Sequence, residues 1–199
     1  YYTCLSRLSM FAGYVTINIS SPNTEGLRDF HDQDELKKLL SGLNKIIKEK
    51  KIECPIAIKI SPDIKNDEIS KIVDLVSSHN IKGIVVSNTT DSNRDRLSDV
   101  KKHETGGLSG QPLKDISTKL IKRFYKETKG KIKIIGVGGV DSGQSAYEKI
   151  TAGADAVQLY TGMVYKGPGI VKEIKKELIS ILKKENFKNI SEAVGINAW

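Results

Sequence analysis

Residues 56–87 read IAIKISPDIKNDEISKIVDLVSSHNIKGIVVS, and their apolar pattern changes period twice. Ile56–Ile60 ends at Ser61-Pro62-Asp63, which predicts a strand followed by a turn. Residues 67–78 place Ile69, Ile72, Val73 and Val76 at helical spacing. Ile84–Ser87 is again a short β-branched run. A strand, a helix and a second strand predict two parallel strands joined by a right-handed crossover.

The same alternation continues on both sides of this unit. Further strands are predicted at Tyr14–Ile19, Ile132–Val137 and Ala156–Tyr160. Further helices are predicted at Glu35–Lys48, Ile116–Thr128 and Ser145–Ala152, with a closing helix around residues 171–182. The chain is therefore an α/β protein with a parallel sheet, either doubly wound or a (β/α)₈ TIM barrel.

The residues at the strand ends favour the barrel. Polar residues or glycine stand at the carboxyl end of every predicted strand, where barrel enzymes build their sites: Asn18, Lys59, Asn88, Gly138 and Tyr160. A complete barrel has eight strands in about 250 residues. Five strand–helix units in 199 residues therefore predict a truncated barrel, and a first residue that is Tyr1 rather than Met agrees with a fragment.

Composition excludes several classes of protein. The net charge is +8, but only five of the 32 basic residues are Arg, and the Lys residues are scattered, which favours a solvated surface over a nucleic-acid groove. The two cysteines, Cys4 and Cys54, form no metal-binding or disulfide pattern, so no metal site is expected. No apolar run is long enough to cross a bilayer.

Glycines after the last two strands allow a phosphate site. Residues 135–139, IGVGG, fail the dinucleotide fingerprint because Asp141 takes the third small position. Together with Gly162 and Gly167, the glycines of this stretch match the usual phosphate site of a TIM barrel, which lies between the loops after two consecutive strands. The alternative is that these glycines only make two tight turns that need positive φ. The phosphate site is favoured over this alternative.

Lys59 lies inside an apolar strand. Ile56, Ile58 and Ile60 share one face, so Ala57 and Lys59 face the other side, which can be the lumen of a barrel. A buried ammonium needs either a structural partner or a negatively charged ligand. The ligand-facing role is favoured.

Two amide–hydroxyl groups end the first and third strands. Residues 18–24, NISSPNT, contain two amides and three hydroxyls, and residues 87–90 read SNTT. Each could be a capped turn, but in a barrel both groups converge on one mouth, where they suit a planar polar ring. The sequence contains neither the nucleophile elbow of a hydrolase nor the phosphate loop of an NTPase, so neither function is favoured.

These motifs together resemble dihydroorotate dehydrogenase of the second, quinone-dependent class. The motifs are NISSPNTEGLR (18–28), IKISPD (58–63), VSNTT (86–90), GGLSGQPL (106–113), IIGVGGVDSG (134–143) and LYTGMVYKGP (159–168). The resemblance covers essentially the whole chain and matches the later five units of that family's barrel. It implies that residues 1–199 are a single domain, the C-terminal portion of an FMN-binding TIM barrel.

The resemblance also implies an activity and a location. The reaction is oxidation of (S)-dihydroorotate to orotate in pyrimidine biosynthesis, with FMN as hydride acceptor and a quinone reoxidising the flavin. Helices preceding this segment would form the quinone tunnel and hold the protein peripherally on the bacterial cytoplasmic membrane or the mitochondrial inner membrane. No nucleic-acid partner and no metal are implied.

Individual roles follow from the matching positions. Ser21 stands where this class has its catalytic base, and Thr24 would help a water to carry the proton away. Asn18 would contact both flavin and substrate, while Asn23, Asn88 and Thr89 would hold the orotate ring. The remaining cofactor-binding residues are Lys59 and Ser87 along the flavin, and Gly110, Gly139, Tyr160 and Thr161 at the ribityl phosphate.

Two other functions stay open from the residues alone. One is another flavin-dependent barrel that reduces a pyrimidine or uridine, such as a dihydropyrimidine or transfer-RNA dihydrouridine enzyme. Cysteine in place of Ser21, or a clustered Arg face, would have favoured it. The other is a non-catalytic phosphate-binding barrel or inactive fragment.

Overall fold

The computed structural model describes residues 1–24, 26–92, 94–95 and 97–199, so Glu25 of the first motif lies outside the described residues. Five parallel strands form one sheet whose spatial order is the chain order. They are β1 (Val15–Asn18), β2 (Ile56–Ile60), β3 (Gly83–Val86), β4 (Lys133–Val137) and β5 (Ala156–Gln158). Doubly wound sheets reverse direction at a switch point, whereas barrels add each strand beside the last. The observed order confirms five consecutive units of a barrel.

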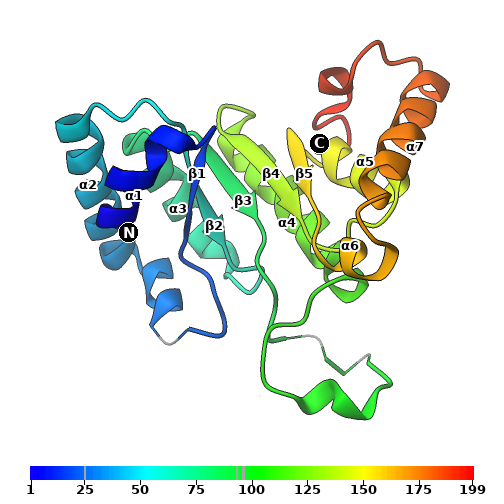
Figure 1. The fold of residues 1–199 in the computed structure, drawn as a ribbon, viewed down its shortest axis with the longest axis horizontal. Coiled ribbons are helices and arrows are strands. Elements are labelled where there is room, and N and C mark those ends of the chain that lie inside the picture. The colour runs from blue at the N-terminus through cyan, green and yellow to red at the C-terminus, as the bar shows by residue number, and fades with distance from the viewer. Residues whose placement is uncertain (25, 93, 96) are drawn as a thin grey trace.

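The sheet is strongly curved (Figure 1). In a flat sheet, β1 and β5 would lie about 19 Å apart, since neighbouring strands are about 4.8 Å apart. Instead, Nε2 of Gln158 in β5 donates a hydrogen bond of 2.8 Å to the hydroxyl of Tyr14, the residue before β1. The inner face therefore closes toward a lumen, as the barrel prediction requires.

Helices cover the outer face of the sheet. They are α1 (Tyr2–Leu8), α2 (Gln33–Lys50), α3 (Asn66–Ser78), α4 (Lys114–Thr128), α5 (Gly143–Thr151) and α7 (Ile170–Lys184). The short helix α6 (Thr161–Lys166) instead follows β5 at the carboxyl ends of the strands (Figure 1). Short 3₁₀ turns add η1 (Ser9–Phe11), η2 (Leu27–His31), η3 (Val100–His103), η4 (Gln111–Leu113) and η5 (Ile190–Ala193). Within the described ranges, no helix combines the length and the apolar character needed to cross a membrane.

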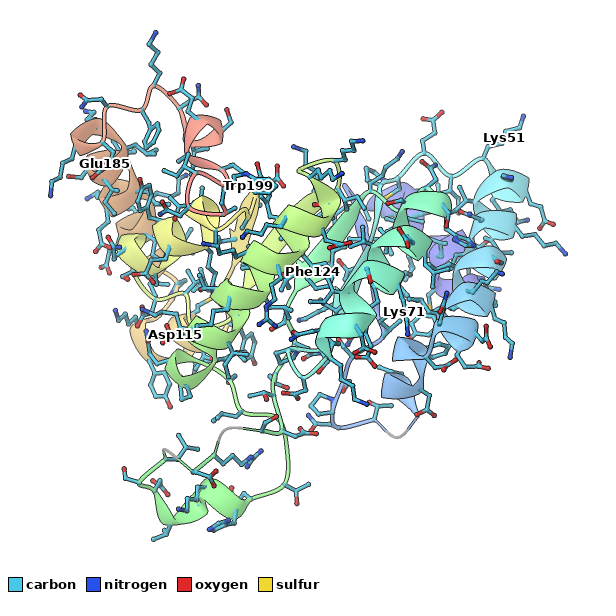
Figure 2. The ribbon with its side chains drawn as sticks, turned by 180° about the vertical axis from the view of Figure 1, so that it is seen from behind. Lys51, Lys71, Asp115, Phe124, Glu185 and Trp199 are labelled. Carbon is cyan, nitrogen blue, oxygen red and sulfur yellow. The ribbon has the colours of Figure 1, made fainter. Side chains whose placement is uncertain are left out.

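Two hydrophobic clusters hold the layers together. The larger one joins strand residues such as Ile58, Ile84 and Ile134 to α2, α3 and α4. Phe124 of α4 is fully buried in it, on the helical side of the molecule that Figure 2 views. The smaller cluster packs α5 against α7 and η5. Ile56, Ile58 and Ile60 all belong to the larger cluster, which confirms the predicted outer face of β2.

The predicted elements are present, with shifted ends. β2 has the predicted bounds, β3 is shifted by one residue, and β1, β4 and β5 are shorter than predicted. Tyr160 is not the last residue of β5 but the residue before α6. Helices α1 and α6 were not predicted. Leu5 is the one buried residue of α1 and α6 buries none, so neither short helix carries an apolar stripe that periodicity could detect.

The long loop at residues 88–111 leaves the sheet and returns to it (Figure 1). The guanidinium of Arg94 donates to the carbonyl oxygens of Lys102 at 3.1 Å and Glu104 at 2.6 Å, and to that of Gly106. Thr90 and Leu108 pair through two backbone hydrogen bonds of 3.1 and 2.7 Å. The loop therefore brings residues 106–110 back over the end of β3.

Candidate active site

A cavity of about 300 Å³ lies at the carboxyl ends of β2 to β5. Among the residues that line it are Lys59, Ser87, Asn88, Thr89, Gly110, Gly139, Tyr160 and Thr161. A larger hollow of about 680 Å³ between the 88–111 loop and α6 shares Gly110, Gly139 and Thr161 with it. Of these two hollows, the smaller cavity is the candidate active site, because the side chains at the ends of β2 and β3 line it.

Lys59 is the charged group of this cavity. Its side chain is half-buried, and burial lowers its pKa. It makes no hydrogen bond or ion pair to any described residue, and so has no structural partner there. Asn18 is its register partner on β1, so the two side chains point to the same face of the sheet. An ammonium without a partner at a cavity wall favours a negatively charged ligand.

The first and third strand ends meet directly. Nδ2 of Asn88 donates to Oδ1 of Asn18 at 3.2 Å and to Oγ of Ser20 at 3.1 Å. Oγ of Ser20 also donates to Oδ1 of Asn18 at 3.0 Å, and the backbone N–H of Thr89 donates to Oδ1 of Asn88 at 2.8 Å. This network brings together two segments about 70 residues apart in the chain, at the same mouth as Lys59.

Ser21 is half-buried in the adjoining turn, beside the cavity rather than in its wall. Its Oγ accepts a hydrogen bond of 3.3 Å from the backbone N–H of Asn23 and one of 3.4 Å from Oγ1 of Thr24. Asn23 and Thr24 are exposed. The motif therefore forms a turn, as the alternative interpretation said, and this turn brings together three of the predicted site residues.

Gly107 lets the returning loop pack on this turn. A Cβ at Gly107 would lie 1.9 Å from Oγ1 of Thr89 and 2.9 Å from Cγ of Pro22. Any side chain there would collide with both segments. The 88–111 loop thus closes over Thr89 and the Ser21 turn.

Three backbone segments converge at the other end of the cavity. Gly110, Gly138 and Gly139 have φ of 78°, 120° and 69°. A Cβ on Gly139 would lie 2.9 Å from the carbonyl oxygen of Gly110, and Oγ of Ser109 lies 2.9 Å from Oγ1 of Thr161. The glycines make tight turns, and these turns also present backbone to a single cavity, as an anion site requires.

Sequence reasoning missed Asp63 as part of this site. Its carboxylate accepts from Oγ of Ser92 at 2.8 Å, from the backbone N–H of Asp91 at 3.1 Å, and from the hydroxyl of Thr90. Asp63 thereby ties the turn after β2 to the segment that carries Asn88 and Thr89. The sequence SPD signals a turn, but no local pattern reveals its distant partner.

A sequence profile of the dihydroorotate dehydrogenase family matches residues 1–182. The chain belongs to the dihydroorotate dehydrogenase family. It is 46% identical over 191 residues to a quinone dihydroorotate dehydrogenase of Trichodesmium erythraeum, covering 92% of this chain and 50% of that protein. It is 42% identical to the mitochondrial quinone dihydroorotate dehydrogenase of Mus musculus, covering 96% of this chain and 49% of that protein.

A crystal structure of dihydroorotate dehydrogenase from Eimeria tenella in complex with ferulenol superposes with a TM-score of 0.94 at 36% identity. The alignment covers 98% of this chain and 57% of that one. The chain therefore spans about half the length of the dihydroorotate dehydrogenases it matches. The family assignment confirms the resemblance and the TIM-barrel fold class, and does not favour the dihydropyrimidine or dihydrouridine alternatives.

Proposed function

We propose that this chain is part of a quinone-dependent dihydroorotate dehydrogenase, which oxidises (S)-dihydroorotate to orotate with FMN as hydride acceptor and a quinone as final electron acceptor. The observation that carries the proposal is the shared mouth of Lys59 and the Asn18–Ser20–Asn88 network. The names of the relatives support the same reaction. We further propose that residues 1–199 form one domain, the C-terminal part of an FMN-binding barrel.

The charge and the chemical groups of the residues that line the cavity suit FMN. Six of the seven residues expected to bind the cofactor line it, and the seventh, Asn18, is hydrogen-bonded to the lining residue Asn88. When bound, FMN supplies a hydride acceptor whose ring becomes negatively charged. The ammonium of Lys59 would stabilise that charge, and the backbone of Gly110 and Gly139, beside Tyr160 and Thr161, would bind the phosphate.

The polar segments beside the cavity suit the substrate. Asn18, Asn23, Asn88 and Thr89 offer amide and hydroxyl groups that match the carbonyl, N–H and carboxylate groups of a dihydropyrimidine. Ser21 would take the proton from C5 while the hydride leaves C6. A serine needs a dry site and a relay to act as a base, and Thr24, at 3.4 Å from Ser21, would pass the proton to water.

A quinone acceptor places the protein at a membrane. Quinones are lipid-soluble, so we propose peripheral association with the bacterial cytoplasmic membrane or the mitochondrial inner membrane. The relative from Trichodesmium erythraeum is named a quinone enzyme and the relative from Mus musculus a mitochondrial quinone enzyme, and these names support the proposal.

Anaerobic flavin reduction tests the proposal. The purified protein should carry flavin, and dihydroorotate should bleach its visible band and yield one orotate per flavin. Ser21→Ala should slow this step by about 10²–10⁴-fold, because that is the usual contribution of a general base. Ser21→Cys should retain part of the rate, and Ser77→Ala, on the distant helix α3, is the control. Flavin that dihydroorotate does not bleach would refute the function, and a normal rate in Ser21→Ala would refute the base.

A further inference from the structure

Lys149 in α5 is fully buried, yet no described carboxylate pairs with it. Its Nζ donates to three neutral acceptors, the carbonyl oxygen of Lys114 at 3.3 Å, Oγ of Ser117 at 3.1 Å and Oγ1 of Thr118 at 3.0 Å. All three belong to the start of α4. Burying an ammonium is costly, and lysine is almost never fully buried unless paired. The cost of burying Lys149 directs attention to what its hydrogen bonds hold in place.

Ser117 extends these contacts to the strand ends. Its hydroxyl donates to the carbonyl oxygen of Val137, the last residue of β4, and lies 3.5 Å from that of Val86, the last residue of β3. The residues that follow, Gly138 and Ser87, both line the cavity. A continuous set of hydrogen bonds therefore runs from Lys149 through Ser117 to the end of β4, and the hydroxyl of Ser117 also lies beside the end of β3.

The start of α4 also packs directly behind the cavity wall. A Cβ on Gly138 would lie 3.0 Å from Cβ of Ser117 and from Cγ of Leu113, and one on Gly139 would lie 2.6 Å from Cβ of Lys114. Contacts this close leave no free space between α4 and the two glycines. A small displacement of the first turns of α4 would therefore move the backbone of Gly138 and Gly139.

We propose that Lys149 is a positioning residue that holds the start of α4 against β3 and β4, so that the backbone of Gly138–Gly139 keeps the shape that binds a phosphate. Lys149 is not a lining residue of the cavity, so it acts through Ser117 and Lys114 rather than by contact with a ligand. The inference rests on the proposed function, because the phosphate is taken to be that of FMN.

Comparison of FMN with riboflavin isolates the phosphate. Apoprotein is titrated with each flavin, and the quenching of flavin fluorescence gives the two dissociation constants. Lys149→Met keeps the length of the side chain and removes the amino group; it should weaken FMN binding by about tenfold, since buried acceptors lose their donor. Riboflavin binding should stay within about twofold, because only the phosphate end is displaced. Lys119→Met, an exposed lysine of α4, is the matched control.

A purely structural role of Lys149 would weaken the binding of both flavins alike. An unchanged ratio of the FMN and riboflavin dissociation constants would therefore overturn the inference. If Lys149→Met does not fold, Ser117→Ala removes only the connecting hydroxyl and should lower the same ratio. Where both single variants fold, the double variant should lose no more FMN affinity than Lys149→Met alone. Losses of FMN affinity that add fully would refute the inference that Lys149 and Ser117 act through the same hydrogen bonds. Wild-type protein that binds neither flavin refutes the proposed function as well, whereas an unchanged ratio in a protein that binds FMN refutes the role of Lys149 alone.

Discussion

At the scale of single residues, Lys59 carries most of the electrostatic character of the site. It stands in a strand whose other face is buried against helices, and its ammonium has no partner within the described part of the chain. The sequence predicted both its direction and its need for a negative ligand, because alternation in a strand assigns faces and apolar neighbours imply burial.

Lys59→Met tests this role through the potential of the bound flavin. Removal of the positive charge should make the anionic reduced flavin less stable, so the two-electron potential should fall by about 30 mV or more, equivalent to about 1.4 kcal/mol. Potentiometric titration against reference dyes measures the shift. Lys71→Met, an exposed lysine on α3 labelled in Figure 2, should leave the potential unchanged. An equal potential in Lys59→Met and the wild-type protein would contradict the charge role.

At the scale of elements, the site depends on ties between the loops that follow successive strands. Asp63 joins the turn after β2 to the segment after β3, and the Thr90–Leu108 pairing joins that segment to the returning loop. These ties place Thr89 against Gly107 and the Ser21 turn. The strand ends alone would bring the side chains of the site to the same edge of the sheet. The contacts between the loops determine the distances between those side chains.

Asp63→Asn should loosen this arrangement while keeping the volume of the side chain. A neutral amide accepts hydrogen bonds less strongly than a carboxylate, so the free energy of unfolding should fall by about 1–3 kcal/mol. The KM for dihydroorotate should rise more than kcat falls, because Asn88 and Thr89 are displaced while Ser21 keeps its own turn. Urea unfolding and steady-state kinetics measure the two effects. Asp74→Asn, exposed on α3, is the control, and a kcat loss without a KM change would contradict the tie.

At the scale of the whole molecule, Lys149 makes stability depend on pH. Burial lowers its pKa from 10.5 to about 7, with Lys114 acting in the same direction and Glu148 and Asp115 against it. Below about pH 7, both the folded and the unfolded chain hold the proton, and the cost of burial is complete. Between pH 7 and 10.5 only the unfolded chain holds it, so the free energy of unfolding rises with pH.

The rise should approach about 1.4 kcal/mol per pH unit for one proton. Urea unfolding between pH 7 and 9 measures it. Lys149→Met should lack this contribution, while Lys59, whose pKa burial also lowers, contributes equally to both proteins. The difference between the two curves therefore belongs to Lys149, and parallel curves would contradict its titration in this range.

The alternation of five strands and five main helices, the faces of β2 and the residues that end the strands could be predicted from the sequence, because each follows from the period of apolar residues along a continuous segment. The same prediction places Asn18, Lys59, Ser87 and Asn88 at one edge of the sheet, since parallel strands share their carboxyl ends. The hydrogen bonds of Asp63, the close approach at Gly107 and the burial of Lys149 under α4 became known from the folded structure alone. These contacts join residues 18 to 85 positions apart in the chain, and periodicity does not encode which distant side chain fills a given space.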